Sequence, residues 1–543
     1  MAELGEKSSV IENQENRDNT YSTLKHWQNF KVRLIVEGIG VGVATGLVVV
    51  LYRFLLDLVG SRVGDFINYQ REHPMWIIAG AVLLFIVAKS VKWLMEMEPL
   101  IKGSGIPQVE GYLLRQIDLP WYRVLVAKFV GGLMSIGAGL SLGREGPSIQ
   151  LGAAIGKGAS KIFKCKKIET KFLITGGASA GLAAAFNAPL AGVMFALEEL
   201  HKNFSPVVLL TALVSAVCGD FVSKQFFGTH PVFDFSGLEQ LPLKYYMYVL
   251  FLGAIVGVFG AIYNKTLIKT QKWYGKMNTK FSRYKFYIPF ALAGILAFVL
   301  PEVLRGGHHL VEGMVKWQFG IKMLIVLLVA KFIFSMLSYG SGAPGGIFLP
   351  LLVIGAITGT LFGQVLVTYG LLPEQYVQNM VILAMAAYFT AIVRAPITGC
   401  LLISEMTGSF QHFLAIAMAC VVAYLIADAF KTEPIYESLL DQLLKNRGLT
   451  FKASSRIKSL IETTVRLGSS LDGSRVKDVK WPCDALIVGI QRGHKEIIPN
   501  GKTEILAGDC LIVLTNEDAA TCVQIGLSKL AEDCQKVASK EWQ

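Results

Sequence analysis

Long apolar segments recur between residues 34 and 429 and are separated by short polar connections. A helix that crosses the hydrocarbon core of a bilayer needs about 20 apolar residues. Several segments are shorter than this, so we expect some helices to tilt and others to end halfway through the membrane. The clearest apolar segments are Leu34 to Leu51, Trp76 to Ala88, Met247 to Ala261, Phe286 to Leu300 and Met323 to Phe334.

The composition also indicates an integral membrane protein with several spans. Hydrophobic residues make up 53% of the 543 positions and charged residues only 17%, which is far more apolar than a soluble domain of this size. Residues 1–30 are polar and lack the apolar core of a cleavable signal peptide, so we expect them to lie in the cytosol. The excess of 52 Lys and Arg over 40 Asp and Glu favours a positive-inside bias and argues against nucleic acid as a partner.

The chain contains an internal repeat. The motif Pro-x4-Gly-Ala-x2-Gly begins at Pro147 and returns at Pro350, an offset of 203 residues. The motif Ala-Pro-(Leu or Ile)-x-Gly begins at Ala188 and returns at Ala395, an offset of 207 residues. Each copy of this second motif is followed by a glutamate, which is Glu198 in the first and Glu405 in the second. Two matched pairs at nearly one offset favour duplicated halves over the general enrichment of small residues in membrane helices.

Charge predicts the orientation. Six lysines lie between residues 157 and 171, in one short connection between apolar segments, and this loop is therefore expected in the cytoplasm. The apolar stretch from Phe172 to Ala185 then leads outward, and the break at Asn187-Ala188-Pro189 turns the chain back. Glu198 and Glu199 are therefore predicted to lie near the cytoplasmic side. Both chain termini are expected in the cytoplasm, and the membrane is expected to be a prokaryotic cell membrane.

Three glycine-interrupted motifs are candidates for an anion path. Each places flexible backbone just before a helix start, where unpaired N–H groups and about half a positive charge attract an anion. Close helix packing is the alternative explanation for one such motif alone. The motifs are Gly103-Ser104-Gly105-Ile106-Pro107, Gly143-Arg144-Glu145-Gly146-Pro147 and Gly345-Gly346-Ile347-Phe348-Leu349-Pro350.

Glu145 is the residue that packing explains least well, because an ionisable side chain between apolar spans is costly unless it has a function. At a helix start its carboxylate can compete with a permeating anion for the same N–H groups. When protonated it loses that attraction and can swing aside, so one residue could serve as gate and proton acceptor. The adjacent Arg144 either pairs with Glu145 or faces water.

The three motifs in this order, the repeat and a terminal tyrosine resemble the CLC family of chloride channels and proton-coupled chloride antiporters. The resemblance covers about residues 30 to 440. It implies an all-helical fold of two inverted-topology halves with broken helices, in a homodimer that has one chloride pathway per subunit. The partners implied are membrane lipid, a second copy of the chain and chloride ions.

The resemblance also implies roles for individual residues. Ser104 matches the anion-coordinating serine of the chloride-selective members, and Ile347 and Phe348 match the residues whose backbone amides bind the central ion. Tyr436 matches the tyrosine whose hydroxyl completes that site, although an interfacial tyrosine is the alternative. Glu145 matches the external gating glutamate. Glu199 matches the internal proton-transfer glutamate of the antiporters, although a solvated helix-end glutamate is the alternative.

Three mechanisms remain in competition. The first is a secondary transporter that exchanges chloride for protons, with Glu145 as gate and proton acceptor, and the second is a passive chloride channel gated by voltage or pH. The match at Glu199 favours the exchanger, because a channel needs no proton relay. A potassium-linked permease would need cation-coordinating carbonyl motifs of the Thr-Val-Gly-Tyr-Gly type, which the sequence lacks.

After Tyr436 the apolar spans end and a small α+β module is predicted. Strand-like runs alternate with turns in the segments 466–473, 485–490 and 497–501. The stretch 506–514 and the turns at Gly473 and Pro499 resemble the TrkA-C (RCK C-terminal) ligand-sensing domain, where other CLC members carry CBS domains. The module either binds a small cytosolic ligand, such as a nucleotide, or is an inert packing domain.

The predicted domain boundaries follow from these assignments. They are a cytosolic segment 1–30, a transport domain 31–440, a linker 441–458, a TrkA-C-like domain 459–532 and a tail 533–543.

No enzymatic or metal chemistry is predicted. The Ser, His and Asp residues form no recognisable nucleophile constellation. No cofactor is expected beyond the transported ions and the possible ligand of the C-terminal module. The cysteines show neither a Cys-x-x-Cys pair nor an accompanying His cluster, so all are expected to be reduced. They are Cys165, Cys218, Cys400, Cys420, Cys483, Cys510, Cys522 and Cys534.

Overall fold

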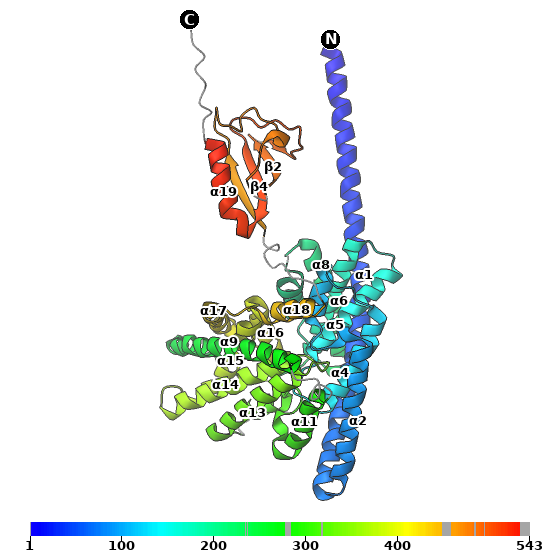
Figure 1. Cartoon of the computed structure of the whole chain (residues 1–543), viewed down its shortest axis with the longest axis vertical. Coiled ribbons are helices and arrows are strands. Elements are labelled where there is room, and N and C mark those ends of the chain that lie inside the picture. The colour runs from blue at the N-terminus through cyan, green and yellow to red at the C-terminus, as the bar shows by residue number, and fades with distance from the viewer. Residues whose placement is uncertain are drawn as a thin grey trace. The chain divides into compact units, whose positions relative to one another are not determined.

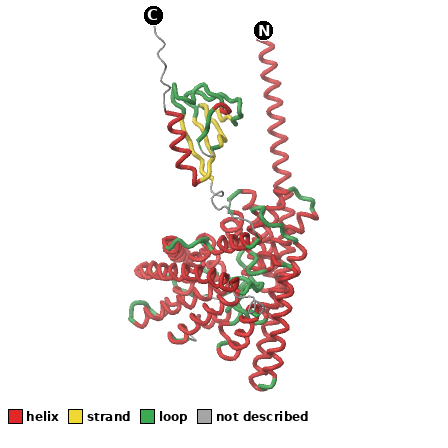
Figure 2. Tube along the Cα trace, viewed as in Figure 1, coloured by secondary structure: helices red, strands yellow, loops and turns green. Residues whose placement is uncertain are grey.

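The structure is a computed structural model of the whole chain, which forms two compact units, Met1–Leu443 and Leu444–Gln543 (Figure 1). The first unit is helical throughout, whereas the second contains strands and a helix (Figure 2). The predicted tail 533–543 lies outside the described residues, as does most of the predicted linker. The described residues are 2–202, 204–233, 235, 237–276, 284–315, 319–447, 458–482, 485–493 and 495–532.

The helical unit combines long helices with several very short ones. The short helices α3, α7 and α12 have eight residues or fewer. The helices are α1 (Ala2–Glu72), α2 (Trp76–Met97), α3 (Ile106–Leu113), α4 (Trp121–Gly137), α5 (Glu145–Ile162), α6 (Lys167–Phe186), α7 (Pro189–Phe195), α8 (Pro206–Phe227), α9 (Tyr246–Lys276), α11 (Ile288–Val299), α12 (His308–Val315), α13 (Ile321–Gly340), α14 (Phe348–Thr368), α15 (Val377–Val393), α16 (Pro396–Thr407), α17 (Phe413–Ala429) and α18 (Ile435–Lys445).

Shorter turns join these helices. Proline at the first or second position begins two of the 3-10 turns, as its fixed φ favours. The turns are η1 (Pro99–Ile101), the π-helical segment η2 (Ala196–His201), η3 (Leu243–Tyr245), η4 (Lys285–Tyr287), η5 (Pro301–Val303), η6 (Glu374–Tyr376) and η7 (Phe410–His412).

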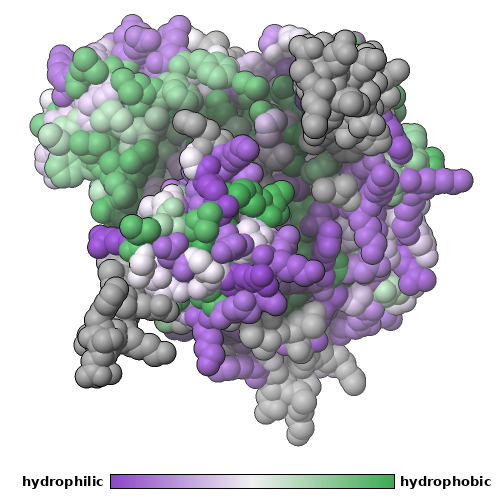
Figure 3. All heavy atoms as spheres, turned by 90° about the horizontal axis from the view of Figure 1, so that it is seen from above, coloured by the Kyte–Doolittle hydropathy of each residue, from purple (hydrophilic) through white to green (hydrophobic). Residues whose placement is uncertain are grey.

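Among the described residues, eight helical segments are long and apolar enough to cross a membrane, which confirms the prediction of a multi-pass membrane protein. A shorter helix, as expected, is also present: the predicted apolar segment 286–300 holds the end of η4 and the 12-residue helix α11. Large hydrophobic areas lie on the surface, as the green regions of Figure 3 show. Such areas suit contact with lipid, although they would be unfavourable in water.

The internal repeat of the sequence is also found in the structure, where helices of the two halves follow one another in the same order. Helices α5 and α6 of the first half correspond to α14 and α15 of the second, and α7 and α8 correspond to α16 and α17. Pro147 and Pro350 each occupy the third position of a helix, where a missing N–H costs nothing. The predicted break at residue 187 is also present, because Asn187 ends α6 in the left-handed conformation with φ of 53°.

Each of the two repeat glutamates caps the start of a helix in the other half of the transport unit. The Glu198 carboxylate accepts a hydrogen bond from the backbone N–H of Thr398 at 2.8 Å, at the start of α16. The Glu405 carboxylate accepts one from the backbone N–H of Ala191 at 2.8 Å, at the start of α7. Because carboxylates stabilise the positive end of a helix, this exchange joins the two halves reciprocally.

The C-terminal unit is an antiparallel sheet with the strand order β1-β4-β2-β3, followed by one helix. Its hydrophobic core brings together residues of β2, β4 and α19, including Ile490, Val513 and Leu527. The prediction of a small α+β module is confirmed. The elements are β1 (Lys458–Thr464), β2 (Leu486–Arg492), β3 (Lys495–Ile497), β4 (Cys510–Asn516), α19 (Glu517–Glu532) and the short turn η9 (Val476–Asp478).

The predicted turn at Gly473 is confirmed, whereas two other predictions for this unit are wrong. The segment 466–473 contains turns, with a φ of 75° at both Gly468 and Gly473, but no strand, because the strand of this region, β1, ends before it at Thr464. The cysteines are not all reduced, because Cys522 is disulfide-bonded. Cysteine spacing alone gave no indication of this disulfide. The free cysteines among the described residues are Cys165, Cys218, Cys400, Cys420 and Cys510.

A buried carboxylate organises the turn before β4. Asp509 is 1% exposed, and it accepts hydrogen bonds from Arg492 Nε at 2.8 Å, Arg492 Nη2 at 2.8 Å and the Leu506 N–H at 2.9 Å. The hydrogen bond from Arg492 lowers the pKa of Asp509 below its ordinary value. The ionised carboxylate therefore stabilises the folded unit above the pKa of the unfolded chain, and this contribution is lost as pH falls through the lower folded-state pKa.

We expect Asp509→Asn to lower the unfolding free energy of the C-terminal unit by about 2 kcal/mol at pH 7, because it removes charge-assisted hydrogen bonds. The measurement is urea-dependent hydrogen exchange of β4 peptides in the full-length protein in detergent. The exposed Asp478 provides the matched control as Asp478→Asn. Equal protection of β4 in the two variants would contradict the assignment.

Candidate functional site

The three predicted motifs meet through their backbones. The Gly143 N–H donates to the Gly346 carbonyl at 2.7 Å, and the Gly346 N–H donates to the Gly143 carbonyl at 2.8 Å. The Gly345 N–H donates to the Gly103 carbonyl at 3.0 Å. The loops that precede α3, α5 and α14 are therefore held together, although they are far apart in the sequence.

Close approach at this junction depends on missing side chains. A Cβ atom on Gly146 would lie 2.9 Å from Ser104 Cβ, closer than real Cβ contacts, and 3.1 Å from Gly346 Cα, which is tighter than most of them. The glycines therefore do serve packing, which was the alternative explanation for them. Packing and anion binding do not compete here, because the close contact is what brings the three helix starts together.

Glu145 is the first residue of α5 and is 0% exposed. The backbone N–H groups of Glu145 and Leu349 face its carboxylate, but neither oxygen accepts a hydrogen bond of full geometry among the described residues. Arg144 does not pair with it: its Nη1 lies 3.5 Å from Asp57 Oδ1 on α1. Neither alternative for Arg144 is observed: its side chain is largely buried, and its ionic partner is Asp57 and not Glu145.

Ser104 is 1% exposed and lies at the turn into α3. Its Oγ accepts a hydrogen bond from the hydroxyl of Tyr339 on α13 at 3.4 Å, and a second one from the Ile106 N–H at 3.4 Å. The serine is thus fixed beside the loop of Gly146, with its side chain oriented by two donors.

Two buried lysines that were not among the predicted site residues also belong to this region. Lys128 on α4 donates to the Ile101 carbonyl at 2.9 Å and the Gly103 carbonyl at 2.6 Å. Lys331 on α13 donates to the Val303 carbonyl at 2.9 Å and the Arg305 carbonyl at 2.7 Å. Both lysines are 0% exposed.

The sequence contains a feature that distinguishes these two lysines from ordinary surface lysines. They lie 203 residues apart, which is the offset between Pro147 and Pro350. A lysine inside an apolar segment that recurs at the repeat offset is unlikely to be a solvated end residue. Each lysine satisfies the carbonyls that end a short 3-10 turn before a half-length helix, so the two halves use the same device.

Ile347 and Phe348 lie at the start of α14, and Leu349 and Pro350 are buried in its first turn. Aromatic contacts connect this start with Tyr436 on α18. The Phe348 ring lies 5.9 Å from the Phe195 ring, which in turn lies 6.3 Å from the ring of Tyr436. Tyr436 is 0% exposed, and its hydroxyl has no hydrogen-bond partner among the described residues. A membrane-interface tyrosine would not be buried in this way.

Glu199 lies on η2 and is 4% exposed, so it is not a solvated helix-end residue. The nearby Lys202 pairs with Glu110 of α3 at 3.2 Å and also with Glu437 of α18. Tyr436 is within electrostatic range of both Glu145 and Glu199. The two predicted proton-transfer residues are therefore both buried in the neighbourhood of Tyr436.

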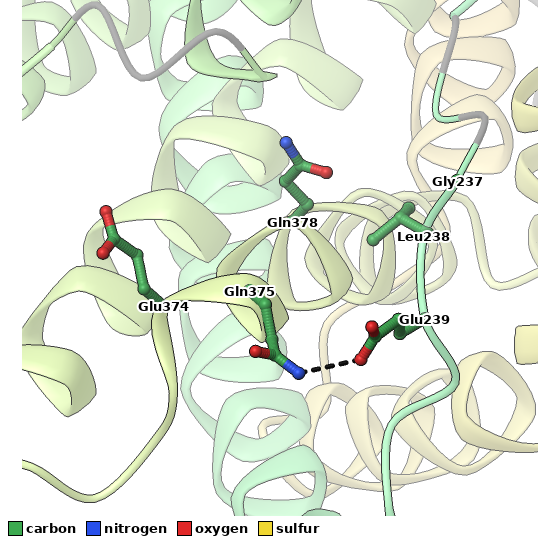
Figure 4. A pocket seen from close by; sticks show the side chains of 6 residues that line it. All are labelled: Gly237, Leu238, Glu239, Glu374, Gln375 and Gln378. Carbon is green, nitrogen blue, oxygen red and sulfur yellow. Dashed lines mark hydrogen bonds between the residues drawn. The ribbon is translucent and has the colours of Figure 1, made fainter.

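A surface pocket lies elsewhere in the helical unit (Figure 4). Glu239 and Glu374 contribute carboxylates to it, and Gln375 Nε2 donates to Glu239 Oε2 at 2.8 Å. None of the predicted site residues lines it, and its two carboxylates would repel an anion. Its lining residues are Gly237, Leu238, Glu239, Glu374, Gln375 and Gln378. Among the described residues, no group of three or more His, Cys, Asp or Glu side chains could hold a metal ion.

Comparison with known proteins identifies two family models in the chain. The model described as voltage gated chloride channel matches residues 83–428. The model described as TrkA-C domain matches residues 460–521.

Similar whole proteins include transporters. The H(+)/Cl(-) exchange transporter ClcA of Vibrio vulnificus strain YJ016 is 34% identical over 417 residues, which cover 75% of this chain and 89% of the relative. ClcA of Vibrio cholerae strain O395 is 34% identical over 425 residues, with the same coverage. A solved slow cyanobacterial Cl-/H+ antiporter is 32% identical, covers 77% of this chain and 99% of its own, and superposes with a TM-score of 0.73. A CLC-type fluoride/proton antiporter, at 23% identity and a TM-score of 0.61, is similar in fold.

We expect Gly146→Ala to destabilise the helical unit, because its Cβ would force the loops of Ser104 and Gly346 apart, and such overpacking costs about 1–3 kcal/mol. The thermal unfolding midpoint in detergent should fall by a few degrees. Gly64→Ala is the matched control, since a Cβ on Gly64 meets nothing within 4 Å. If both variants unfold at the wild-type temperature, the loops are not packed as tightly as described.

Proposed function

We propose that this chain, which belongs to the voltage-gated chloride channel (CLC) family and carries a C-terminal TrkA-C domain, exchanges chloride for protons across the membrane. The names of the ClcA relatives and of the cyanobacterial antiporter support exchange over passive conduction. Further support for exchange comes from the geometry around the two buried glutamates of this chain.

The main support for the proposal is the environment of the Glu145 carboxylate. Its carboxylate is fully buried at a helix start, where the backbone N–H groups of Glu145 and Leu349 face it but complete no full hydrogen bond to either oxygen. A buried carboxylate that is so incompletely satisfied is costly as an anion, and the cost is relieved by taking up a proton or by moving toward water. Both responses suit a residue that blocks the anion path when charged and opens it when protonated.

The anion would occupy the junction of the three motifs. Backbone N–H groups at Ile347 and Phe348 and the hydroxyls of Ser104 and Tyr436 are the donors for it. The buried hydroxyl of Tyr436 has no partner among the described residues, so a chloride ion would satisfy it. These donors bind an anion through partial charges, which holds it loosely enough for transport.

The proton would reach the junction by way of Glu199. This carboxylate is buried, and Tyr436 lies within electrostatic range of it and of Glu145. Chloride and protons would thus follow separate routes on the side predicted to be cytoplasmic and converge near Tyr436. Because a passive channel has no use for a second buried carboxylate, Glu199 supports the exchanger.

Three further proposals rest on the family resemblance. The transporter acts as a homodimer, with membrane lipid around it and a separate pathway in each subunit. Its termini lie in the cytoplasm of a prokaryotic cell. The TrkA-C domain binds a small cytosolic ligand, such as a nucleotide, and biases transport by binding two conformations unequally.

Purified protein in liposomes tests the exchange. We expect an imposed chloride gradient to drive protons uphill, measured with a pH electrode in weakly buffered medium after a potassium ionophore sets the voltage. Chloride flux is followed in the same vesicles with a chloride electrode. Chloride flux without proton movement would contradict exchange and would favour a passive channel.

We expect Glu145→Gln to abolish proton movement and to retain chloride flux, because glutamine imitates the protonated carboxyl group and cannot carry a proton. The same two electrodes make the measurement. Glu312→Gln is the control, since Glu312 is a glutamate of α12 with a half-exposed side chain. Proton transport retained in Glu145→Gln would refute the role of Glu145.

A further inference from the structure

We propose that Arg53 of α1 supplies the positive charge that stabilises an anion at the starts of α5 and α14. This anion is the ionised Glu145 carboxylate or, once Glu145 is protonated, a chloride ion. Arg53 is a positioning residue, because it acts on the anion through its charge and donates its hydrogen bonds elsewhere. The inference rests on the proposed exchange and deepens it, since it names a group that links proton binding at Glu145 to chloride binding.

The Arg53 side chain is 6% exposed and joins α1 to α6 and α8. Its Nη1 donates to the Ala184 carbonyl at 2.6 Å, to Asn187 Oδ1 at 3.0 Å and to Ser223 Oγ at 2.8 Å. Its guanidinium carbon lies 3.9 Å from the centre of the Phe227 ring. All these partners are neutral, and among the described residues no carboxylate forms an ion pair with Arg53.

The second half of the repeat contains the same arrangement with one difference. Asn187 and Arg394 lie 207 residues apart, and each ends a helix in the left-handed conformation, with φ of 53° and 71°. Arg394 donates to the Tyr424 and Thr432 carbonyls, both at 2.9 Å, and its guanidinium carbon lies 5.2 Å from the centre of the Tyr424 ring. Its Nη1 also lies 3.6 Å from Asp428 Oδ1. A guanidinium therefore completes both helix breaks, and the one in the second half has a carboxylate beside it.

This difference indicates that the charge of Arg53 has a function of its own. A charged group buried in a membrane protein is costly, and a nearby opposite charge offsets part of the cost. The pair of Arg394 with Asp428 shows that a helix break can be completed by a guanidinium whose charge is compensated. The hydrogen bonds of Arg53 at the first break therefore do not explain why its charge has no such partner.

The acidic groups nearest to Arg53 have closer cations, with the exception of Glu145. Asp57, Asp220 and Glu145 all lie within electrostatic range of the guanidinium. Asp57 lies 3.5 Å from Arg144, and Asp220 lies 2.6 Å from Lys224. Glu145 forms no ion pair among the described residues, and Arg53 is within electrostatic range of it. The charge of Arg53 is thus opposite that of the ionised Glu145 carboxylate.

The other charged groups of this region interact with the same two ion pairs. Arg305 donates to the Gly60 carbonyl, and its charged neighbour is Asp57. The Glu405 carboxylate, which caps α7, has Asp220 and Lys224 as charged neighbours. His308 pairs with Glu312 at 3.3 Å and has Arg144 and Asp57 as further charged neighbours.

Protonation of Glu145 would leave the charge of Arg53 without a counter-charge. The Glu145 carboxylate faces its own N–H group and that of Leu349, at the starts of α5 and α14. A proton on this carboxylate removes its negative charge, whereas the guanidinium stays charged at any physiological pH. A chloride ion at the same helix starts would restore the balance, and the attraction is strong because the surroundings are largely excluded from water. Proton binding would thereby favour chloride binding.

Chloride binding to the full-length protein in detergent tests the inference, measured by isothermal titration calorimetry. All variants carry Glu145→Gln, which imitates the protonated gate. Adding Arg53→Gln removes the charge and should raise the dissociation constant for chloride about tenfold, as expected for the loss of one unit charge at moderate distance. Adding Arg53→Lys keeps the charge and should leave the dissociation constant near that of Glu145→Gln alone. Arg394→Gln is the matched control, because the charge of Arg394 is compensated by Asp428.

A second pair of variants leaves Arg53 and its hydrogen bonds in place. Phe227→Glu puts a carboxylate beside the guanidinium and compensates its charge, as Asp428 does for Arg394. It should weaken chloride binding about as much as Arg53→Gln does, whereas the uncharged Phe227→Gln should not. This pair decides the question if Arg53→Gln fails to fold.

Chloride affinity that is unchanged in Phe227→Glu would overturn the proposal, because a charge at this position would then not act on the anion. Equal losses in Arg53→Lys and Arg53→Gln would also overturn it, since they would assign Arg53 to the helix break alone. If Glu145→Gln by itself binds no chloride, the proposed anion site and this inference fail together. If the wild type moves chloride but no protons in liposomes, the proposed exchange fails, while calorimetry still decides the role of Arg53.

Discussion

The pair of hydrogen bonds between Gly143 and Gly346 is the contact on which the rest of the transport unit depends. These hydrogen bonds bring the Gly346 backbone against Gly146 as well, where a Cβ on Gly346 would lie 3.0 Å from Gly146 N, so the junction favours glycine. Once the two backbones are joined, α5 and α14 must begin at the same place, and their unpaired N–H groups point into a common region. The remaining features, including the fixed serine and the buried tyrosine, are arranged around helix starts that this contact has brought together.

Several ionisable groups are buried in this region, and they differ in whether their polar atoms have hydrogen-bond partners. Lys128 and Lys331 are satisfied by carbonyls that end short turns, so they fix the structure and stay where they are. Glu145 and Glu199 have carboxylate oxygens that accept no full hydrogen bond among the described residues. A satisfied charge rigidifies a membrane protein, whereas an unsatisfied one has reason to change its protonation or position. The distinction separates the structural ionisable groups from those suited to transport.

Much of this arrangement was predictable from the sequence. The repeat, the helix starts at Pro147 and Pro350 and the break at Asn187 follow from local rules about glycine and proline, and the structure contains all of them. The ion pair of Arg144 with Asp57 and the contacts of Lys202 were not predictable, because they join residues through tertiary structure. The turn at Gly473 was predicted correctly, but the strand expected within 466–473 lies earlier, in β1, which ends at Thr464. The disulfide at Cys522 left no mark in cysteine spacing.

The exchange of carboxylates between Glu198 and Glu405 bears on the origin of the duplicated chain. Each half supplies the group that completes a helix in the other, so neither half is self-sufficient. A gene that encoded only one half would produce a chain with an unsatisfied carboxylate and an uncapped helix. Two such chains would satisfy both groups only by assembling in opposite orientations within the membrane. Gene fusion would then have converted the association of two separate polypeptides into contacts within one chain.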